Sequence, residues 1–371
     1  MSEENNIVNT LKETDRKCPN CEGVMDFDPT TGGLMCPYCG YTEEIKASVN
    51  NSEGEVDENS TKVAERSLED AENIENCDWG VATKTVVCKS CGAHTVYDNQ
   101  QISSECPYCG SNQVMDAGDE KTMAPGGVIP FKIDQKEASK RFEKWLKGKF
   151  FAPKAAKENS KAKNFNGMYL PYWTFDAVTK STYTGEFGKD RRVKKGDKEE
   201  IITDWFRTRG RYDEDFDDEL IPGTNQHNQF MLNGIAPYNT QESKVYKPEY
   251  VAGFGAERYS IGIKAAWEKA KAIISGKIKS AINSKILHEH NADHVRNLNV
   301  KTAFSNITYK YLLLPVWIAN YKYNGKVYQF MVNGETGKVS GKSPVSAIKV
   351  ILTIAVIIAI FVLIHYINAA R

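Results

Sequence analysis

The chain has 371 residues, 41% of them hydrophobic, and its 48 Lys and Arg residues balance 48 Asp and Glu residues. A formal net charge of zero excludes a global electrostatic attraction to nucleic acid. The length leaves room for at least one sizeable hydrophobic core besides any small modules that fold around a metal.

Eight of the nine cysteines form four Cys-x-x-Cys pairs near the amino terminus, in two sets with 14 residues between the pairs of each set. Thiolates suit tetrahedral Zn²⁺, and a two-residue spacing lets one turn aim two sulfurs at one metal. Glycine follows the second cysteine in three of the four turns and accepts a left-handed backbone there. We therefore predict two structural zinc ions, with these ligands: Cys18, Cys21, Cys36 and Cys39; Cys88, Cys91, Cys106 and Cys109.

This prediction places a flexible tail at residues 1–11, a first zinc ribbon at 12–45 and a second at 81–118. Paired disulfides are the alternative, which the lack of a recognisable signal peptide disfavours. An all-cysteine site is closed and therefore structural, with no open position for catalysis. The ninth cysteine, Cys77, has no partner pair and is interpreted as a bystander.

An acidic segment separates the two ribbons. From Glu43 to Asp78 there are twelve Asp and Glu residues against three Lys and Arg residues, with few large apolar side chains. Such a composition is typical of a linker. We assign the linker to residues 46–80 and expect it to be disordered or partly helical around Lys62 to Asn76.

Residues 119–344 are expected to form an α+β body with a weak internal repeat of strand, helix and meander. The first copy has a strand at 128–133, then Asp134 and Glu137 as a capping box before an amphipathic helix. The second copy has a strand at 259–263 and a helix that carries Trp267, Ala270, Ile274, Ile278 and Ile282 on one face. Each copy then has a Leu-Pro-x-Trp motif, at Leu170 and Leu314, that opens a strand. The dipeptide Asn324-Gly325 between two alternating runs predicts a hairpin.

Two clusters in the body are candidate metal sites. His288, His290 and His294 lie within seven residues, and either a third metal site or a solvated helix end fits them, the helix end better. The acidic run from Asp213 to Glu219 lacks the alternating ligands and central glycine of an EF-hand, so we expect a solvated acidic loop.

The carboxy-terminal segment predicts a transmembrane helix at residues 345–367, with a short tail at 368–371. The run from Val350 to Ile367 is apolar on all sides and spans roughly 27 Å as a helix. Lys338, Lys342 and Lys349 precede it, and this excess of lysine predicts a cytoplasmic amino terminus and body. We expect a single-pass, tail-anchored protein of the cell membrane, and reduced cysteines that hold zinc agree with that location.

The segment from Tyr311 to Val339 resembles the signature of the bacterial family of TFIIB-type zinc-ribbon-containing proteins. Its most specific part runs from Leu-Pro-x-Trp at Leu314 to Asn-Gly-x-Thr-Gly at Asn333. Members are often labelled primosomal protein N′ or replication-restart helicase. Two rubredoxin-like ribbons and a terminal span further resemble the ribbon membrane protein encoded beside a phage shock protein A homologue. That resemblance implies a role in membrane-stress adaptation with a phage shock protein A-type partner.

The helicase label does not fit the residues. The nearest approach to a phosphate-binding loop, Gly337 to Ser343, has three residues between its glycines where the motif needs four, and it abuts the apolar segment. No catalytic residues or other cofactors are expected.

Two functions remain. The first is a non-enzymatic membrane-anchored scaffold or adaptor that recruits protein partners in envelope stress. The alternative is a membrane-tethered zinc-ribbon protein that binds nucleic acid. There is no Lys or Arg between Cys18 and Cys39, and only Lys89 is basic between Cys88 and Cys109. Ribbons that bind a phosphate backbone usually carry clustered basic residues, so this composition favours protein partners.

Overall fold

The structure is a computed structural model of the whole chain. The residues it describes are 17–23, 25–45, 63–73, 83–88, 93–98, 108, 114–116, 125–158, 165–195, 198–257 and 259–369. They form a mixed α+β protein with one apolar helix at the carboxy terminus.

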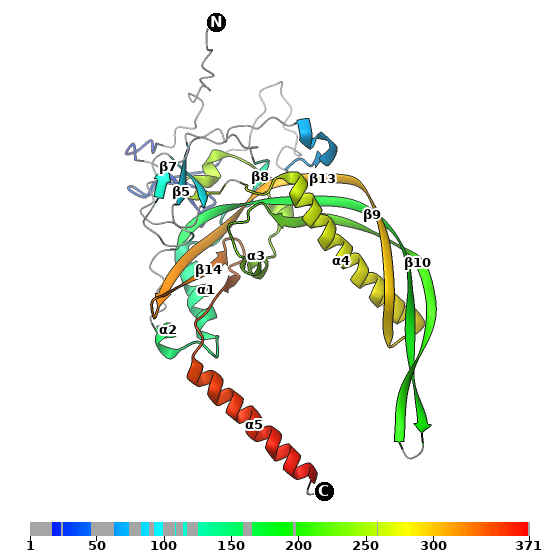
Figure 1. The fold of residues 1–371 in the computed structure, drawn as a ribbon. Helices are drawn as coiled ribbons and strands as arrows, with labels where there is room; N and C mark the ends of the chain where they lie inside the picture. Colours follow the sequence, from blue (N-terminus) through cyan, green and yellow to red (C-terminus); the bar gives the residue numbers. More distant parts are fainter. Residues whose placement is uncertain are drawn as a thin grey trace.

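Three long antiparallel strands form a curved arch, in the order β10, β9, β13 (Figure 1). They are β9 (Asn166–Lys195), β10 (Lys198–Pro222) and β13 (His294–Tyr323). Their lengths of 30, 25 and 30 residues far exceed the usual five or six.

The arch bends at β-bulges, where the register shifts between Phe216 and Glu219, between Arg296 and Asn299, and between Ser305 and Thr308. Each bulge contains one residue with positive φ, namely Asp218, Asn297 or Asn306. Asn and Asp tolerate this left-handed conformation better than other non-glycine residues, and bulges bend the strand that carries them. The positions of these three residues in the sequence therefore set where the arch curves.

Helix α4 (Ile263–His290) lies along the inner side of the arch (Figure 1). Its buried side chains recur every fourth residue and contact all three long strands: Ala266, Ala270, Ile274, Ile278, Ile282 and Ile286. The predicted apolar face of this helix is confirmed, but the strand predicted at 259–263 is wrong. Gly262 is the N-cap of α4 and Ile263 is its first helical residue. Ile261 is buried, but it lies in the loop that precedes the helix.

The internal repeat becomes a pairing in the fold. In the β9–β13 ladder Leu170 lies opposite Leu314, with Pro171 opposite Leu313 and Pro315 opposite Tyr169. The two Leu-Pro-x-Trp motifs are thus related by a local two-fold axis through this leucine pair. The expectation that each motif opens a strand is wrong for the second, because β13 begins 20 residues earlier, at His294. Its outer part alternates exposed and half-buried residues that lie against β9.

The opposite end of the arch packs against α1 (Gln135–Lys147), β14 (Lys326–Asn333) and β15 (Val339–Gly341). Asp134 caps α1 by accepting from the amide of Glu137 at 2.6 Å, which is the N-cap half of the predicted capping box, while the Glu137 carboxylate accepts from Arg141. Phe142 of α1 stacks on Phe330 of β14, with ring centroids 3.5 Å apart. Asn324 and Gly325 both have positive φ and form the predicted two-residue hairpin between β13 and β14. Of the strand predicted at 128–133, only Val128 lies in a strand, the two-residue β8 (Gly127–Val128).

Short elements complete the fold. The segment predicted as the first zinc ribbon, called the first ribbon below, contains β1 (Asp26–Asp28), β2 (Gly33–Met35) and β3 (Thr42–Glu43). Within the acidic segment, β4 (Arg66–Ser67) pairs with β13 and leads into the 3₁₀ helix η3 (Leu68–Asn73). The remaining elements are β5 (Thr83–Cys88), β6 (His94–Asp98), β7 (Val114–Asp116), α2 (Lys154–Glu158), α3 (Gln229–Ile235), η4 (Thr240–Glu242), β11 (Lys244–Val245), η5 (Pro248–Val251) and β12 (Gly255–Ala256).

The run from Asp213 to Glu219, which we expected to be a solvated loop, lies inside β10. Alternate residues of this strand form an exposed charged row with two blocks: Arg207, Arg209 and Arg211, then Asp213, Asp215 and Asp217. The residues between them, such as Tyr212 and Phe216, pack against the core. The two-residue period of a strand explains why a segment so rich in acid is not a loop. Among the described strands, β10 pairs only with β9, so its other edge is open.

Helix α5 (Ala347–Ala369) extends away from the body and is called the α5 leg below (Figure 1).

Candidate metal centre

The first ribbon presents two turns of the same design, one at each pair of cysteines. In the first turn the amide of Glu22 donates to the carbonyl of Cys18, and the amide of Cys18 to the carbonyl of Gly23. In the second turn the amide of Gly40 donates to Cys36, and the amide of Cys36 to Tyr41. Glu22 and Gly40 both have positive φ, of 60° and 74°. The role that the sequence suggested for glycine is thus confirmed at Gly40, while Glu22 adopts the same conformation at some steric cost.

The four thiols of Cys18, Cys21, Cys36 and Cys39 converge on one point. The Sγ atoms of Cys18 and Cys39 are 3.4 Å apart, those of Cys21 and Cys36 are 3.5 Å apart, and all four lie within 4.8 Å of one another. A tetrahedral Zn²⁺ with bonds of 2.3 Å separates its sulfur ligands by about 3.8 Å. The cluster therefore has the donor type, number and spacing that hold one metal ion.

The electrostatics of the four thiols point the same way. The backbone amide of Gly23 favours the thiolate of Cys21, but hydrogen bonds with the neighbouring thiols outweigh it and raise its pKa to about 12. At Cys36 burial favours the thiol, yet the backbone amides of Cys39 and Tyr38 and the neighbouring thiols lower its pKa to about 7. Thiols this close cannot all ionise without a cation among them. A bound divalent metal would supply that charge, and four sulfur ligands would leave it no open position for a substrate.

The ribbon is docked on the body. Phe27 on β1 is buried, and its ring meets those of Tyr250 and Phe254 edge to face, at centroid distances of 5.9 and 6.4 Å. The amide of Phe27 donates to the carbonyl of Ala252 at 3.1 Å. Gly253 has a φ of +80°, and a Cβ there would lie 2.9 Å from the side chain of Asp26. The first ribbon is therefore part of the same hydrophobic core as the arch.

The second zinc site lies mostly outside the described residues. The side chain of Cys88 is not described, and Cys91, Cys106 and Cys109 fall in the gaps, as does Cys77. The backbone of β5, β6 and β7 is described and pairs antiparallel, with Cys88 opposite Val114. The second zinc ion stays a prediction.

Tyr108, from the last Cys-Pro-Tyr-Cys turn, is buried against the body in a polar cluster that the sequence did not indicate. Its hydroxyl donates to Glu257 at 3.1 Å, and its carbonyl accepts from the side chain of Gln329. Glu257 also accepts from Thr224 and lies 3.1 Å from Nε2 of His227. A buried carboxylate with several partners is a costly arrangement that specifies one geometry. This cluster therefore fixes how Tyr108 sits on the body.

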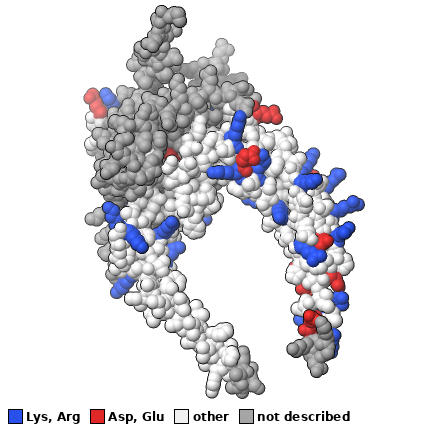
Figure 2. Space-filling view, viewed as in Figure 1, with Lys and Arg blue, Asp and Glu red and all other residues white. Residues whose placement is uncertain are grey.

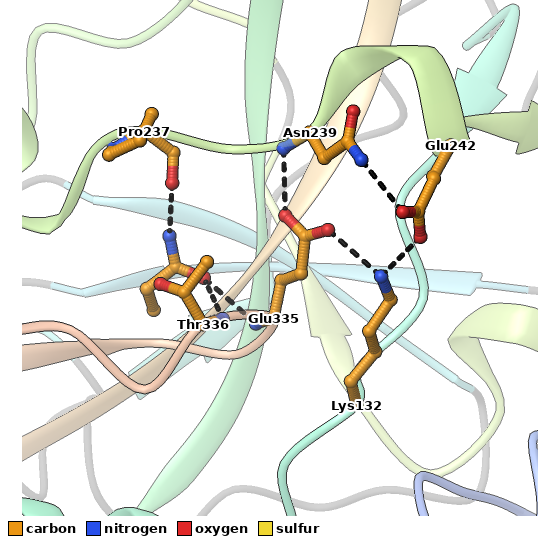
Figure 3. A network of polar contacts seen from close by, with 7 residues as sticks. Lys132, Pro237, Asn239, Glu242, Glu335 and Thr336 are labelled. Atoms are coloured by element: carbon orange, nitrogen blue, oxygen red, sulfur yellow. Dashed lines mark hydrogen bonds and ion pairs between the residues drawn. The ribbon is translucent and has the colours of Figure 1, made fainter.

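The turn from Asn333 to Gly337 is joined by hydrogen bonds and ion pairs to neighbouring segments of the body (Figure 3). Oδ1 of Asn333 accepts from the amides of Glu335 and Thr336, while Nδ2 donates to the carbonyls of Ile235 and Pro237. Glu335 accepts from the amide of Asn239 and from Lys132, which also binds Glu242. Burial opposes the charge of Lys132, but these two carboxylates raise its pKa. Since β15 (Val339–Gly341) follows directly, the glycines here serve a turn and a strand, not a phosphate-binding loop.

The three histidines do not converge. His290 stacks on Phe187 at a ring distance of 4.0 Å and contacts Thr208, while His294 binds Asp190 at 3.0 Å. His288 lies in the last turn of α4. The two described groupings with the spacing of metal ligands are the four thiols and the carboxylates of Glu65, Asp176 and Asp217.

The acidic grouping already contains a cation. The ammonium of Lys310 is buried and lies 2.8 Å from Asp218 and 3.2 Å from Glu65. Burial opposes its charge, but the Asp218 carboxylate raises the pKa of Lys310. We interpret Lys310 with Glu65, Asp176 and Asp218 as an ion-pair network at a bend of the arch, with Asp217 beside it.

Comparison with known proteins identifies a relative along nearly the whole chain. A protein of Bacillus subtilis (strain 168), described as uncharacterized protein YdjG, is 30% identical over 334 residues, which is 90% of this chain and 91% of the relative. The chain belongs to the YdjG family. No family model and no solved structure matches it.

In this member of the YdjG family, one described helix is long and apolar enough to cross a membrane. The stretch Ala347–Ile367 has 21 residues with a mean hydropathy of 3.1, and none of it is buried against the body. A soluble core helix of this composition would be covered by other elements. Together with the four-thiol cluster, the helix gives the chain a candidate metal centre and a candidate membrane anchor.

Proposed function

We propose that this protein is a non-enzymatic scaffold, anchored in the cell membrane by α5, whose zinc ribbons and body recruit protein partners at the cytoplasmic face. The observation that carries the proposal is the closed four-thiol centre of a ribbon built into the same core as the arch. Such a centre stabilises a surface and leaves no metal position for chemistry.

The anchor supports the proposal through concentration. A protein confined to a membrane meets other membrane-bound molecules at a high effective concentration, so weak individual contacts suffice. Lys338, Lys342 and Lys349 before the apolar run favour a cytoplasmic body. Because Phe27 docks the first ribbon on η5, the proposed partner surface combines ribbon and body.

The resemblance to zinc-ribbon membrane proteins encoded beside a phage shock protein A homologue supports a role in envelope stress. A phage shock protein A-type protein is the partner that we propose. The experiment is affinity capture of the tagged full chain from detergent-solubilised membranes, after nuclease treatment, with that protein as the measured product. We expect capture by the native chain and loss of capture by Cys36→Ser, which should remain in the membrane fraction.

Cys77→Ser is the matched control, since it removes a cysteine outside both predicted zinc sites and should leave capture unchanged. In a parallel capture without nuclease, recovery of nucleic acid that nuclease treatment abolishes would favour the alternative, a membrane-tethered nucleic-acid-binding ribbon protein. ATP hydrolysis by the purified chain would overturn the non-enzymatic proposal. For topology, protease added to right-side-out vesicles should leave the ribbons uncut.

A further inference from the structure

The turn between α1 and α2 exposes two phenylalanines on a rigid base. Phe150 and Phe151 are 68% and 40% exposed, and their rings contact each other at 5.2 Å. The adjacent Ala152 is buried, and its amide donates to the carbonyl of Lys149. Helix α1, which leads into the turn, is held by buried Phe142 on β14. The two rings are therefore presented to the surroundings by a fixed support.

This turn is bonded to the start of α5. The amide of Ser346 donates to the carbonyl of Phe151 at 2.8 Å. The ammonium of Lys349 donates to the carbonyls of Phe150 and Ala152 at 3.0 and 2.8 Å. Lys349 is the last charged residue before the apolar run that starts at Val350. The boundary of a hydrocarbon layer around α5 would lie near this ammonium, and the turn would lie at the same level.

The turn is basic between Glu143, which pairs with Lys147 at 3.7 Å, and Glu158. Residues 144–157 contain five lysines and no acidic residue, in a chain whose formal net charge is zero: Lys144, Lys147, Lys149, Lys154 and Lys157. The first four of these side chains are exposed. Figure 2 shows lysine and arginine atoms gathered where the α5 leg joins the body. Exposed aromatic rings beside lysines are typical of segments that sit in the headgroup region of a membrane.

We propose that residues 144–157, hereafter the basic turn, dock on the anionic lipid surface that surrounds α5. The inference rests on the proposed membrane span and goes beyond it, because it gives the body a fixed orientation on the bilayer. Phe150 and Phe151 enter the interface, and the lysines contact anionic headgroups. Each lysine near an anionic leaflet changes a surface-contact equilibrium by roughly fivefold. Several lysine contacts together favour this docked orientation over free rotation of the body about α5.

The test uses three phenylalanines of nearly equal exposure, each replaced in the full chain by the photo-crosslinking analogue benzoylphenylalanine. They are Phe150, at 68%, Phe361 within α5, at 71%, and Phe230 on α3, at 72%. The variants are reconstituted in nanodiscs of phosphatidylcholine alone or with phosphatidylglycerol, and lipid adducts are measured by intact mass spectrometry. We expect adducts at 361 in both lipids, adducts at 150 that increase several-fold with phosphatidylglycerol, and few adducts at 230.

Each outcome decides. Adducts at 361 without adducts at 150 would overturn the docking and leave the proposed anchor intact, while their absence at both positions would overturn both. Equal labelling at 150 and 230 would mean that exposure alone explains the signal and would overturn the docking. An adduct between position 150 and a second copy of the chain would overturn it too, because the partner of the basic turn would then be protein and not lipid.

A charge test completes the experiment. Lys149→Gln with Lys154→Gln should lower adduct formation at 150 several-fold in phosphatidylglycerol, whereas Lys269→Gln with Lys279→Gln on exposed positions of α4 should not. An equal loss from both pairs would contradict a specific contact by the basic turn.

Discussion

Replacing Phe27 by alanine tests whether the first ribbon is a fixed part of the body. The substitution removes both edge-to-face contacts, with Tyr250 and Phe254, while leaving the four cysteines untouched. Zinc content should therefore stay the same while the ribbon detaches from η5.

The magnitude follows from the contacts. An edge-to-face aromatic pair contributes about 0.5–1.5 kcal/mol beyond its burial, and truncating a buried phenylalanine costs about 3–5 kcal/mol in total. Part of that total is lost inside the ribbon, where Phe27 lies opposite Leu34. Assigning about 2 kcal/mol to docking lowers the docked-to-undocked ratio about 30-fold.

Hydrogen exchange of the full chain in detergent measures this ratio, because the amide of Phe27 is protected by its bond to Ala252 only when the ribbon is docked. Exchange in the peptides of β1 and η5 should accelerate by about that factor. The matched control is Phe230→Ala, which removes the same atoms from an exposed site and should change stability by less than about 0.5 kcal/mol. Exchange within twofold of the native rate would refute the docking, and loss of zinc would show that Phe27 supports the metal site instead.

Three further predictions concern the metal, the arch and the anchor. Cys36→Ser should remove one zinc equivalent from an expected two, and elemental analysis that returns no zinc from the freshly reduced native chain would contradict both sites. Lys310→Met should lower the free energy of unfolding by about 3–5 kcal/mol at neutral pH, because Asp176 and Asp218 lose their cation. That loss should shrink as pH falls toward the pKa of Asp176, which burial raises, since protonation then removes the unpaired charge; an equal loss at about pH 4 and pH 7 in thermal unfolding would count against the network. Deleting residues from Val345 onward should release a soluble body with an unchanged circular dichroism spectrum, and a chain that still sediments with membranes would argue against α5 as the anchor.

The sequence predicted what depends on local pattern. The four thiols meet because Cys-x-x-Cys turns and a 14-residue separation determine their geometry almost alone. The apolar face of α4, the Asn324-Gly325 hairpin and the Asp134 cap follow from periodicity and turn chemistry in the same way.

Long-range pairing was not accessible to that reasoning. Sequence alone favours a loop for the acidic run of β10, because its high charge masks a two-residue alternation that only pairing with β9 makes meaningful. Sequence alone places the Leu314 motif at the start of a strand, because nothing local shows that the preceding 20 residues pair with β9. The contact of Phe27 with Tyr250 of η5 joins residues more than 200 positions apart. Glu257 gives no signal because its partners, Tyr108 and the nearby pair Thr224 and His227, come from two separate segments. Only a sequence motif shared by the contacting segments would have indicated these long-range contacts.

The open edge of β10 has a consequence for solubility. A long unpaired strand normally invites another strand to add, and this is a common route to aggregation. Here an incoming strand would meet three arginines and then three aspartates, from Arg207 to Asp217. An uncharged strand would strip water from these groups without offering partners, and that desolvation is unfavourable. The arch can thus hold an extended edge in solvent without the adhesiveness that an apolar edge of equal length would bring.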